Sequence, residues 1–471
     1  MKFLKLFFLL IIFAACKKLP EKPNIILILA DDLGYNDVSC YRNSNFAQHY
    51  ENAPTSQTPN IDKLAEQGIR FTDFYCGAAV CSPSRAALIT GRNATRVGIY
   101  NWIPPNGPMH LRSEEITIAE LLKKENYNTG HFGKWHLTSE GMGQPLPNDQ
   151  GFDYSFFAYN NAVPSHHNPE NYYRNGEPAG KLEGYACQLV VDEALQWLDK
   201  NKDNQTPFYI DVWFNEPHLK VAAPDELTKR HNYNQEYYGA IENMDIAVGR
   251  VIEYLENNNL LENTIIIFTS DNGSQWDHSN DPLRGEKCFN YEGGIREPFI
   301  VSWPPKIPKG KVSNFNGSFT DILPTIASIT KIPLPSDRVY DGIDISPVLF
   351  GVEMEREKPI FFYRYFHDPI CMLREGDWCL LGYDELIPKA ESLNEGQLGK
   401  IKPWHFMPVH MEYLKPLKPK YFELYNLKED KEQDRDLSEK YPEIVSKMKN
   451  KMMELREEMI TEGGDWYNQS F

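Results

Sequence analysis

The chain has 471 residues, of which 41% are hydrophobic, and a formal net charge of −17 at pH 7. That length exceeds what one compact core usually absorbs, so we expect one large domain with an appendage, or two domains. The acidic balance argues against a nucleic-acid-binding protein and would repel a polyanion at long range, so an anionic ligand must be bound by a local basic pocket.

The N-terminal segment has the pattern of an export signal. Lys2 and Lys5 precede an apolar run over residues 6–15, which is too short to span a membrane as a stable helix. The run ends in small residues directly before Cys16, which resembles the lipobox of bacterial lipoproteins. We predict that residues 1–15 are a signal peptide and that Cys16 is lipidated and anchors the protein to a membrane; an ordinary cleaved signal peptide is the alternative. The predicted location is the bacterial outer membrane, on its periplasmic side rather than the cell surface.

Three continuous apolar runs predict strands that are buried on both faces of a sheet: residues 24–30, 207–214 and 264–270. Amphipathic segments lie between these runs. Because strands and helices alternate, we expect an α/β fold with a large, mostly parallel central sheet flanked by helices. The predicted helices are residues 60–67, 116–125, 184–201 and 237–257.

The pattern changes after residue 358, where short aromatic-rich segments alternate in polarity and predict antiparallel strands. A charged helix from residue 441 to about 462 follows them. We therefore divide the chain into a large domain over residues 21–357 and a smaller α+β subdomain over residues 358–471. The predicted antiparallel strands are residues 359–364, 378–383 and 421–426.

Two of the predicted strands end in pairs of oxygen-bearing side chains. Asp31 and Asp32 follow the first strand, and Asp271 and Asn272 follow the strand at 264–270. Ligands of open α/β sheets gather at the carboxyl ends of the strands. Adjacent carboxylates are costly unless a cation neutralises them, and carboxylate and amide oxygens suit calcium or magnesium. Together the pairs predict a metal site, although either pair alone favours a solvated acidic turn.

The segment Cys81-Ser82-Pro83-Ser84-Arg85 begins another predicted helix. A proline at the first helical position, with helix formers behind it, places Cys81 at the N-terminus of this helix. The free amides of a helix start favour an anion, and Arg85 lies one turn further on the same side. These residues predict an anion pocket with a sulfur atom at its mouth. The alternative is a buried structural cysteine.

The pattern Cys-x-Pro-x-Arg, followed by Thr-Gly-Arg at residues 90–92, resembles the signature of the type I sulfatases in the alkaline phosphatase superfamily. The resemblance runs from residue 24 to about 297, and it makes residues 21–357 the predicted catalytic domain. It implies that a maturation enzyme oxidises Cys81 to formylglycine (3-oxoalanine), whose hydrate attacks the sulfur of a sulfate ester. It also implies a bound Ca²⁺ in preference to Mg²⁺. The implied metal ligands are Asp31, Asp32, Cys81, Asp271 and Asn272.

Further segments match the family in order. Lys134 and His136 stand in Gly-Lys-Trp-His, and His218 ends Glu-Pro-His. Lys287 lies in a segment that leads to Tyr-Glu-Gly-Gly, with Arg284 as the alternative for that lysine. The resemblance implies that Lys134, Lys287 and Arg85 neutralise the sulfuryl oxygens together with the cation. It implies that His218 is the acid for the leaving alcohol, with Lys287 as a helper. It also implies that His136 is the base. His166, His167, Trp276, His278 and His367 are further candidates for substrate contact, without motif support.

The predicted substrate is a sulfated polysaccharide or oligosaccharide, since an exported, lipid-anchored sulfatase would meet such molecules. Algal glycans such as ulvan or carrageenan are the first candidates, and host glycosaminoglycans are another. One alternative is a phosphonate or phosphodiester hydrolase of the same superfamily. The other is a non-catalytic protein that binds sulfated glycans with Cys81 unmodified.

Overall fold

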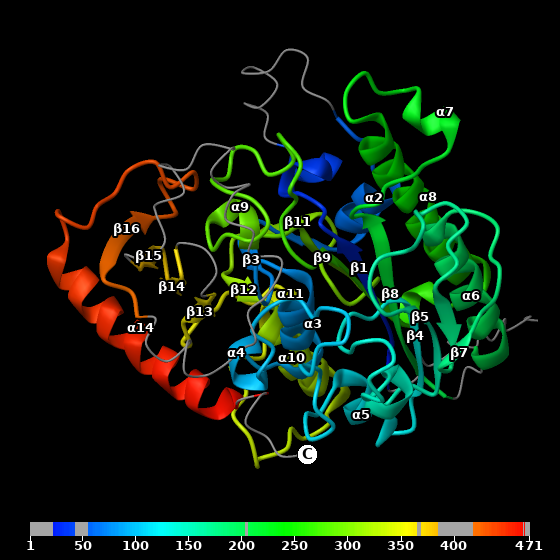
Figure 1. The fold of residues 1–471 in the computed structure, drawn as a ribbon, viewed down its shortest axis with the longest axis horizontal. Coiled ribbons are helices and arrows are strands. Elements are labelled where there is room, and N and C mark those ends of the chain that lie inside the picture. Colours follow the sequence, from blue (N-terminus) through cyan, green and yellow to red (C-terminus); the bar gives the residue numbers. More distant parts are fainter. Residues whose placement is uncertain are drawn as a thin grey trace, which may run out of the picture.

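A computed structural model describes residues 22–42, 55–202, 206–364, 369–384, 418–464 and 466. Helices cover both sides of a large sheet, and a smaller sheet with one long helix lies beside it (Figure 1). The predicted signal peptide, Cys16 and His367 lie outside the described residues. Within the described part, no helix combines the length and the apolar character that crossing a membrane requires.

Parallel strands form the centre of the large sheet, in the order β9 (Thr264–Ser270), β1 (Asn24–Asp31), β8 (Phe208–Pro217), β4 (Asn128–Lys134) and β5 (Tyr154–Ala158). β1 pairs with β8 along one edge and with β9 along the other, so it is an interior strand, and all its residues are buried. The three predicted strands correspond to β1, β8 and β9. The predicted α/β fold with a mostly parallel sheet is confirmed.

Short strands extend both edges of this sheet, and several run against the parallel direction. β10 (Phe299–Ser302) pairs antiparallel with β9 and with β2 (Ile69–Phe71), and β11 (Lys311–Ser313) then pairs parallel with β2. At the other edge β6 (Tyr172–Arg174) and β7 (Glu177–Pro178) add antiparallel pairings. The edges make the sheet mixed, while its centre stays parallel.

The two faces of β1 belong to two hydrophobic cores. Ile25, Leu27 and Leu29 point into one core, and Ile26 and Ile28 point into the other. The first core is covered by α3 (Cys81–Thr90), α5 (Ile118–Lys123) and α10 (Ile322–Thr330). The second is covered by α2 (Pro59–Gln67), α6 (Ala186–Asn201) and α8 (Gln235–Asn257). The four predicted helices correspond to α2, α5, α6 and α8.

Short elements connect these parts. They are η1 (Tyr35–Asp37), η2 (Ser39–Tyr41), β3 (Phe74–Tyr75), α4 (Ala94–Val97), η3 (Pro147–Gln150), α7 (Asp225–Thr228), η4 (Leu261–Asn263), α9 (Glu292–Ile295), β12 (Gly317–Ser318), η5 (Phe319–Asp321) and α11 (Ser346–Leu349).

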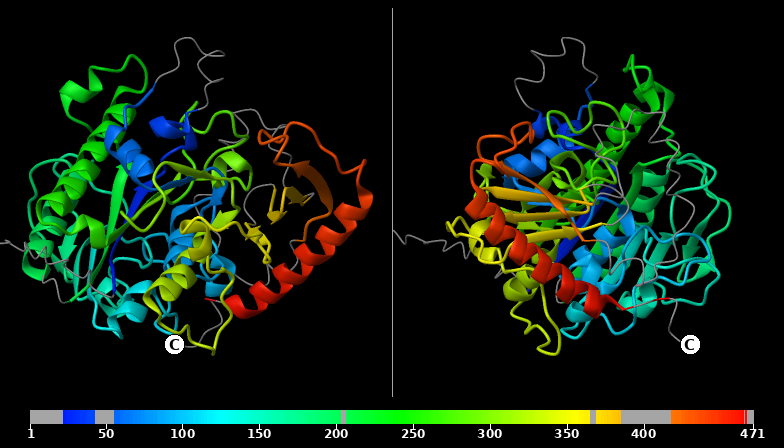
Figure 2. Two further views of the ribbon diagram at one scale, coloured as in Figure 1. Left: turned by 180° about the vertical axis from the view of Figure 1, so that it is seen from behind. Right: turned by 60° about the vertical axis from the view of Figure 1, so that its left-hand side comes forward.

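The C-terminal subdomain contains an antiparallel sheet in the order β13 (Ile360–Tyr363), β14 (Cys371–Glu375), β15 (Trp378–Tyr383) and β16 (Tyr421–Asn426). The long helix α14 (Pro442–Gly463) runs along it, red in Figure 2. The predicted smaller α+β part with an antiparallel sheet is confirmed. β14 was not predicted, and it completes the sheet between β13 and β15.

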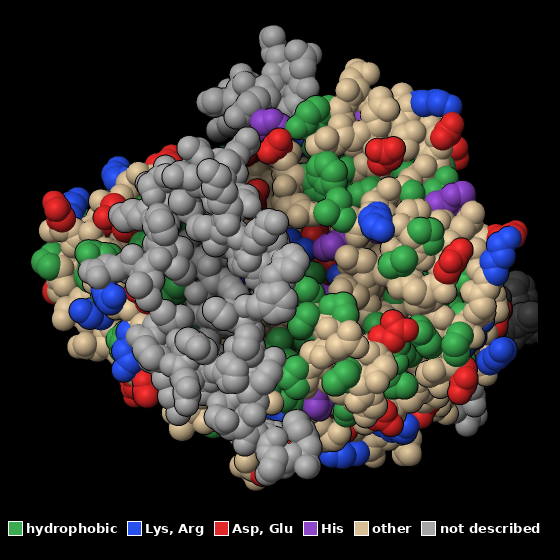
Figure 3. Space-filling model, viewed as in Figure 1, with side chains coloured by type: hydrophobic (Ala, Val, Ile, Leu, Met, Phe, Trp, Pro, Cys, Tyr) green, Lys and Arg blue, Asp and Glu red, His purple; other side chains and the backbone are tan. Residues whose placement is uncertain are grey.

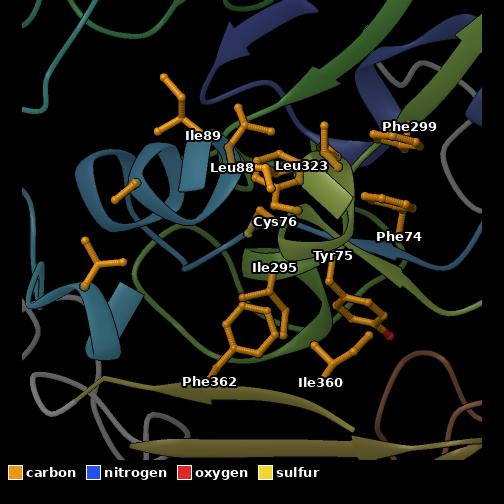
Figure 4. Close-up of a cluster of buried hydrophobic side chains, with 14 of the residues drawn as sticks. Phe74, Tyr75, Cys76, Leu88, Ile89, Ile295, Phe299, Leu323, Ile360 and Phe362 are labelled. Carbon is orange, nitrogen blue, oxygen red and sulfur yellow. The ribbon is translucent and has the colours of Figure 1, made fainter. Parts of the chain in front are cut away.

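The subdomain joins the large domain through buried side chains. Ile360 and Phe362 of β13 face Tyr75 and Ile295 of the large domain in Figure 4, and the Tyr75 and Phe362 rings are 6.4 Å apart. Arg374 of β14 forms an ion pair with Asp73 of the large domain across the same junction, at 3.0 Å. The aromatic contacts continue the first core, so the two parts share one hydrophobic interior.

The end of α14 meets α4 at a close backbone approach. A Cβ atom placed on Gly463 would lie 2.2 Å from the carbonyl oxygen of Thr95. We expect Gly463→Ala to lower the free energy of unfolding by about 1–3 kcal/mol, because the added methyl group must displace the backbone of α4. Without that contact the change would stabilise the helix. Thermal unfolding of Gly463→Ala checks this, with Ser446→Ala, at an exposed position of the same helix, as the control. An unchanged or raised midpoint for Gly463→Ala would contradict the close approach.

Candidate active site

Four strands of the central sheet bring polar side chains to one edge. Asp31 ends β1, Lys134 ends β4, His218 follows β8 and Asp271 follows β9. These strands are parallel neighbours (Figure 1), so their carboxyl ends meet. The amide of Asp271 donates to the carbonyl of Ala30 at 3.1 Å, which holds the ends of β1 and β9 together.

An acidic cluster lies at this edge. Asp31, Asp32, Cys81 and His218 each place one ligand atom within 4.8 Å of the others. Asn272 donates through Nδ2 to Asp32 Oδ1 at 2.7 Å, which leaves its own Oδ1 available. Oδ1 of Asn272 and Oδ1 of Asp31 are buried without a hydrogen-bond partner. Asp31 Oδ1 lies 3.4 Å from the guanidinium of Arg85 but accepts no hydrogen bond from it. Buried oxygens without a hydrogen-bond donor are costly and a hard cation coordinates such oxygens, so the residues fit an oxygen-ligated metal ion.

The pKa values of Asp31 and of the neighbouring Asp271 are shifted in opposite directions. Burial alone would raise the pKa of Asp31, but Lys134, His218 and Arg85 hold that pKa well below its ordinary value. Burial and the charge of Asp31 raise the pKa of Asp271 to about 7. Two neighbouring carboxylates cannot both ionise freely in a buried place without compensation, and the nearby cations supply part of it.

Cys81 lies at the start of α3, as predicted from the sequence pattern. α3 begins at Cys81 itself, so Pro83 is the third helical residue rather than the first. This position tolerates proline because the first amides of a helix have no intrahelical acceptor. Cys81 is a free thiol and only 3% exposed. Burial raises the pKa of its thiol to about 12, although Lys134 and Lys287 act in the opposite direction.

Arg85 lies one turn along α3, and its guanidinium is completely buried. It donates to Asp271 Oδ2 at 2.9 Å and to the carbonyl of Lys134 at 2.7 Å, and it lies over the Trp213 ring. These bonds direct Arg85 toward the acidic cluster and the end of β4. Arg85 therefore holds Asp271 in place, and its expected contact with sulfuryl oxygens stays a prediction.

Lys134 and Lys287 approach the cluster from different elements. Lys134 Nζ donates to Asp31 Oδ2 at 2.7 Å and lies 3.7 Å from Cys81 Sγ. Asn161, which motif reasoning missed, accepts from the same ammonium group at 3.0 Å. Asn161 follows β5 in a loop with no sequence pattern that would single it out.

Lys287 donates to Asp32 Oδ2 at 2.6 Å. Burial lowers the pKa of a lysine, but the Asp32 carboxylate raises that of Lys287 above its ordinary value, so the side chain is an ammonium ion. Arg284, the alternative, donates to Tyr425 OH at 3.1 Å in the C-terminal subdomain. Lys287 is therefore the basic residue of this segment that lies at the cluster.

The two motif histidines, His218 and His136, have different hydrogen-bond partners. His218 Nδ1 donates to the carbonyl of Leu219 at 2.7 Å, and its Nε2 lies 3.3 Å from Asp32 Oδ2. Burial lowers the pKa of His218 to about 4, against the opposing charge of Asp32. His136 Nε2 donates to the carbonyl of Ile103 at 3.1 Å, and its buried Nδ1 has no partner. Burial holds the pKa of His136 well below its ordinary value, so the ring is neutral and its Nδ1 carries a free lone pair.

The candidates without motif support have different environments. His166 is completely buried, neither of its ring nitrogens has a hydrogen-bond partner, and its Nδ1 is 3.8 Å from Glu216 Oε1. His167 is exposed and stacks on Tyr185. The half-buried Trp276 and His278 belong to the loop after Asn272, where Trp276 contacts Tyr237 and His278 lies 3.0 Å from Asp281 Oδ2. His166, His167, Trp276 and His278 remain candidates for substrate contact.

The turn after β9 and the segment with Lys287 touch through their backbones. A Cβ atom on Gly273 would lie 2.0 Å from the carbonyl oxygen of Gly293. The amide of Lys287 also donates to the carbonyl of Ser274 at 3.2 Å. On the face shown in Figure 3, a His side chain lies near the centre of the view, with Lys or Arg side chains close to it. The geometry therefore combines a hard-cation site, two ammonium groups, a sulfur atom at a helix start and two neutral imidazoles.

This arrangement is matched by known proteins. The sulfatase family profile matches residues 23–332. The chain is 33% identical over 374 residues to N-acetylgalactosamine-6-sulfatase of Canis lupus familiaris, covering 73% of this chain and 69% of that protein. It is 34% identical over 395 residues to arylsulfatase A of Homo sapiens, covering 77% of this chain and 74% of that protein.

Solved structures agree with the sequence matches. The structure of Ps i-CgsB in complex with k-i-k-neocarrahexaose has a TM-score of 0.77 and 26% identity, covering 92% of this chain and 93% of that one. PsFucS1 sulfatase from Pseudoalteromonas sp. has a TM-score of 0.75 and 25% identity, covering 95% and 92%. The chain belongs to the sulfatase family and is a sulfuric ester hydrolase.

Proposed function

We propose that this sulfatase removes sulfate from a sulfated carbohydrate, with residue 81 as formylglycine and Ca²⁺ as its metal ion. The observation that carries the proposal is the position of Cys81, at a helix start, beside Lys134 and inside the acidic cluster. A carbohydrate is supported by the solved neighbour that holds a neocarrahexaose and by a relative named for N-acetylgalactosamine. Among carbohydrates, an algal polysaccharide such as carrageenan or ulvan, or its oligosaccharides, is the first choice.

In this proposal Asp31, Asp32, Asp271 and Asn272 hold the cation together with residue 81. The two oxygens of Asp31 and Asn272 that accept no hydrogen bond support this ligand set, and all-oxygen ligands suit calcium. A bound divalent cation supplies Lewis acidity at the sulfuryl oxygens. Arg85 holds Asp271 from behind, so this carboxylate keeps one orientation.

Formylglycine supplies a hydrated aldehyde, which is a better nucleophile in this place than a protonated thiol. The maturation enzyme that makes it is the proposed protein partner. Lys134 Nζ, which lies beside residue 81, binds a sulfuryl oxygen there, and Lys287 binds another from the Asp32 side. Both ammonium groups also neutralise the carboxylates when no substrate is bound.

The two histidines transfer protons at the two ends of the reaction, His136 at residue 81 and His218 at the leaving alcohol. His136 holds a bare Nδ1 in a dry place and accepts the proton from residue 81. His218 presents Nε2 toward Asp32 and protonates the leaving alcohol, with Lys287 beside the same carboxylate as helper. An anionic sulfate ester next to His218 raises the pKa of this ring and thereby favours the protonated form that an acid needs.

We further propose that the protein is exported and anchored by a lipid on Cys16, facing the periplasm. The charged start, the short apolar run and the small residues before this cysteine support the proposal. An anchored sulfatase would act where imported glycan fragments pass.

The modification of residue 81 is tested by mass spectrometry of the tryptic peptide 71–85 from protein co-produced with a maturation enzyme. We expect residue 81 to have lost its sulfur and gained an aldehyde, while Cys76 in the same peptide still reacts with iodoacetamide. If both Cys76 and Cys81 are alkylated in a folded, co-produced protein, the proposed formylglycine chemistry is wrong. Cys81→Ala should then retain glycan binding, as the non-catalytic alternative requires.

Substrate class is tested with a panel of sulfated oligosaccharides, 4-nitrophenyl sulfate and bis(4-nitrophenyl) phosphate. We expect sulfate release from at least one oligosaccharide to exceed phosphodiester turnover, and Cys81→Ala to lose that release by about a thousandfold or more, in line with loss of a nucleophile. Faster phosphodiester or phosphonate turnover would favour the superfamily alternative, whose solved representative from Agrobacterium radiobacter shares the fold with a TM-score of 0.63.

The metal site is tested by thermal unfolding with added CaCl₂ or MgCl₂. Calcium at a hundredfold excess over its dissociation constant should stabilise the protein by about 2.7 kcal/mol, because it binds the folded state only. We expect a smaller shift with magnesium, and a smaller shift with calcium for Asn272→Leu, which removes one of the five proposed ligands and the hydrogen bond to Asp32. Asp225→Asn, at an exposed acid, is the control and should respond like the parent. Equal shifts in the Asn272 and parent proteins would contradict the ligand set.

The lipid anchor is tested by labelling producing cells with an alkyne fatty acid. The parent protein should carry the label and enter the detergent phase, while Cys16→Ser should do neither. An unlabelled parent whose mature N-terminus lies elsewhere would support an ordinary signal peptide. Protection from protease added to intact cells distinguishes the periplasmic side from the cell surface.

A further inference from the structure

The turn that carries Lys287 is held on one side by the large domain. The amide of Cys288 donates to the carbonyl of Ala79 at 2.8 Å, two residues before Cys81. With the bond from Lys287 to Ser274, this ties the lysine turn to both the Cys81 helix and the loop after β9. These contacts set the turn against the acidic cluster from the sheet side.

The other side of the same turn is held by the C-terminal subdomain. Arg364, which follows β13, donates through Nη1 to the carbonyl of Cys288. Gln433, in the loop between β16 and α14, accepts from the amide of Glu292 through Oε1 at 3.0 Å. Asn290 donates to the carbonyl of Pro369 at 3.0 Å. The subdomain therefore binds the turn at three points between residues 288 and 292.

The backbone of the turn needs such support. Cys288 has φ of 82°, a left-handed conformation that side chains with a Cβ atom disfavour. Such conformations persist where contacts from the surrounding structure hold the backbone in place. The peptide groups of Cys288 are held from both directions, by Ala79 and by Arg364, and Lys287 is the preceding residue. Gln433 is itself at φ of 58° and only 1% exposed, so its amide is firmly placed.

We propose that Arg364 and Gln433 are positioning residues for Lys287, so that the C-terminal subdomain sets the place of an active-site ammonium group. The inference rests on the proposed role of Lys287. Without the donor of Arg364 the Cys288 carbonyl loses its bond, and the turn relaxes toward a more ordinary backbone conformation. Lys287 Nζ then leaves its place 2.6 Å from Asp32 Oδ2, where it meets the substrate.

The test compares Arg364→Met with Arg364→Lys, using kcat and KM for 4-nitrophenyl sulfate in co-matured enzyme. Misplacement of an active-site group by about 1 Å can cost about a hundredfold in rate, so we expect Arg364→Met to lose about tenfold to a hundredfold in kcat/KM. Arg364→Lys keeps a donor of similar reach and should recover most of the loss. Gln433→Met provides a second variant that changes no charge and should lower kcat/KM in the same direction.

A double-mutant cycle with Lys287→Ala separates positioning from a general structural effect. If Arg364 acts through Lys287, Arg364→Met should cost less than about twofold once Lys287 is gone, because coupled residues are not additive. An equal loss in both backgrounds would overturn the inference, as would full activity in both Arg364→Met and Gln433→Met. If Lys287→Ala itself retains full activity, the proposed role of Lys287 fails instead.

Asn316→Ala is the matched control. Asn316 donates to the carbonyl of Gly376 at 2.8 Å and so also links the large domain to the smaller sheet, but away from the lysine turn. This variant should keep kcat/KM within about twofold of the parent, as expected for a surface hydrogen bond outside the site. Thermal unfolding of every variant confirms that the comparison concerns folded protein; a comparable loss of activity in Asn316→Ala would contradict the specific role of Arg364 and Gln433.

Discussion

Repulsion among buried carboxylates at the ends of parallel strands is the constraint on which the rest of the structure depends. The sheet brings these carboxylates together, and burial makes their charges expensive unless each has a partner. The partners come from three separate parts of the chain: a helix, a strand end and a long turn. The pairs are Arg85 with Asp271 at 2.8 Å, Lys134 with Asp31 at 2.7 Å and Lys287 with Asp32 at 2.6 Å.

This local balance explains how an acidic chain can bind an anion. The net charge of −17 is spread over the whole molecule and is screened by salt within about 10 Å. At the strand ends three carboxylates face three side-chain cations, so a divalent cation would turn the local sum positive. In the proposed function that surplus attracts the sulfate group, and Lys134 and Lys287 exchange a carboxylate oxygen for a sulfuryl oxygen.

The sequence predicted the elements whose pattern is strong and the residues that stand in motifs. Apolar runs revealed β1, β8 and β9, whereas β4 includes buried polar residues such as His131, which lies 3.4 Å from Asp211, so its strand character was hidden. β14 was missed because its five residues do not alternate in polarity, and the charged Arg374 among them is buried in an ion pair with Asp73. Of the candidate site, the motif residues were predicted, but Asn161, Arg364 and Gln433 act through contacts distant in sequence, which no local pattern records. The burial of His166 likewise depends on the surrounding chain.

The close approach of Gly273 to the carbonyl of Gly293 has a consequence for how this site can vary. Because no side chain lies between the two backbones, the turn beside Asn272 and the turn bearing Lys287 behave as one mechanical part. A side chain added at Gly273 would therefore disturb the turn beside Asn272 and the turn bearing Lys287 together. Side chains in the surrounding loops can change size without moving this shared backbone.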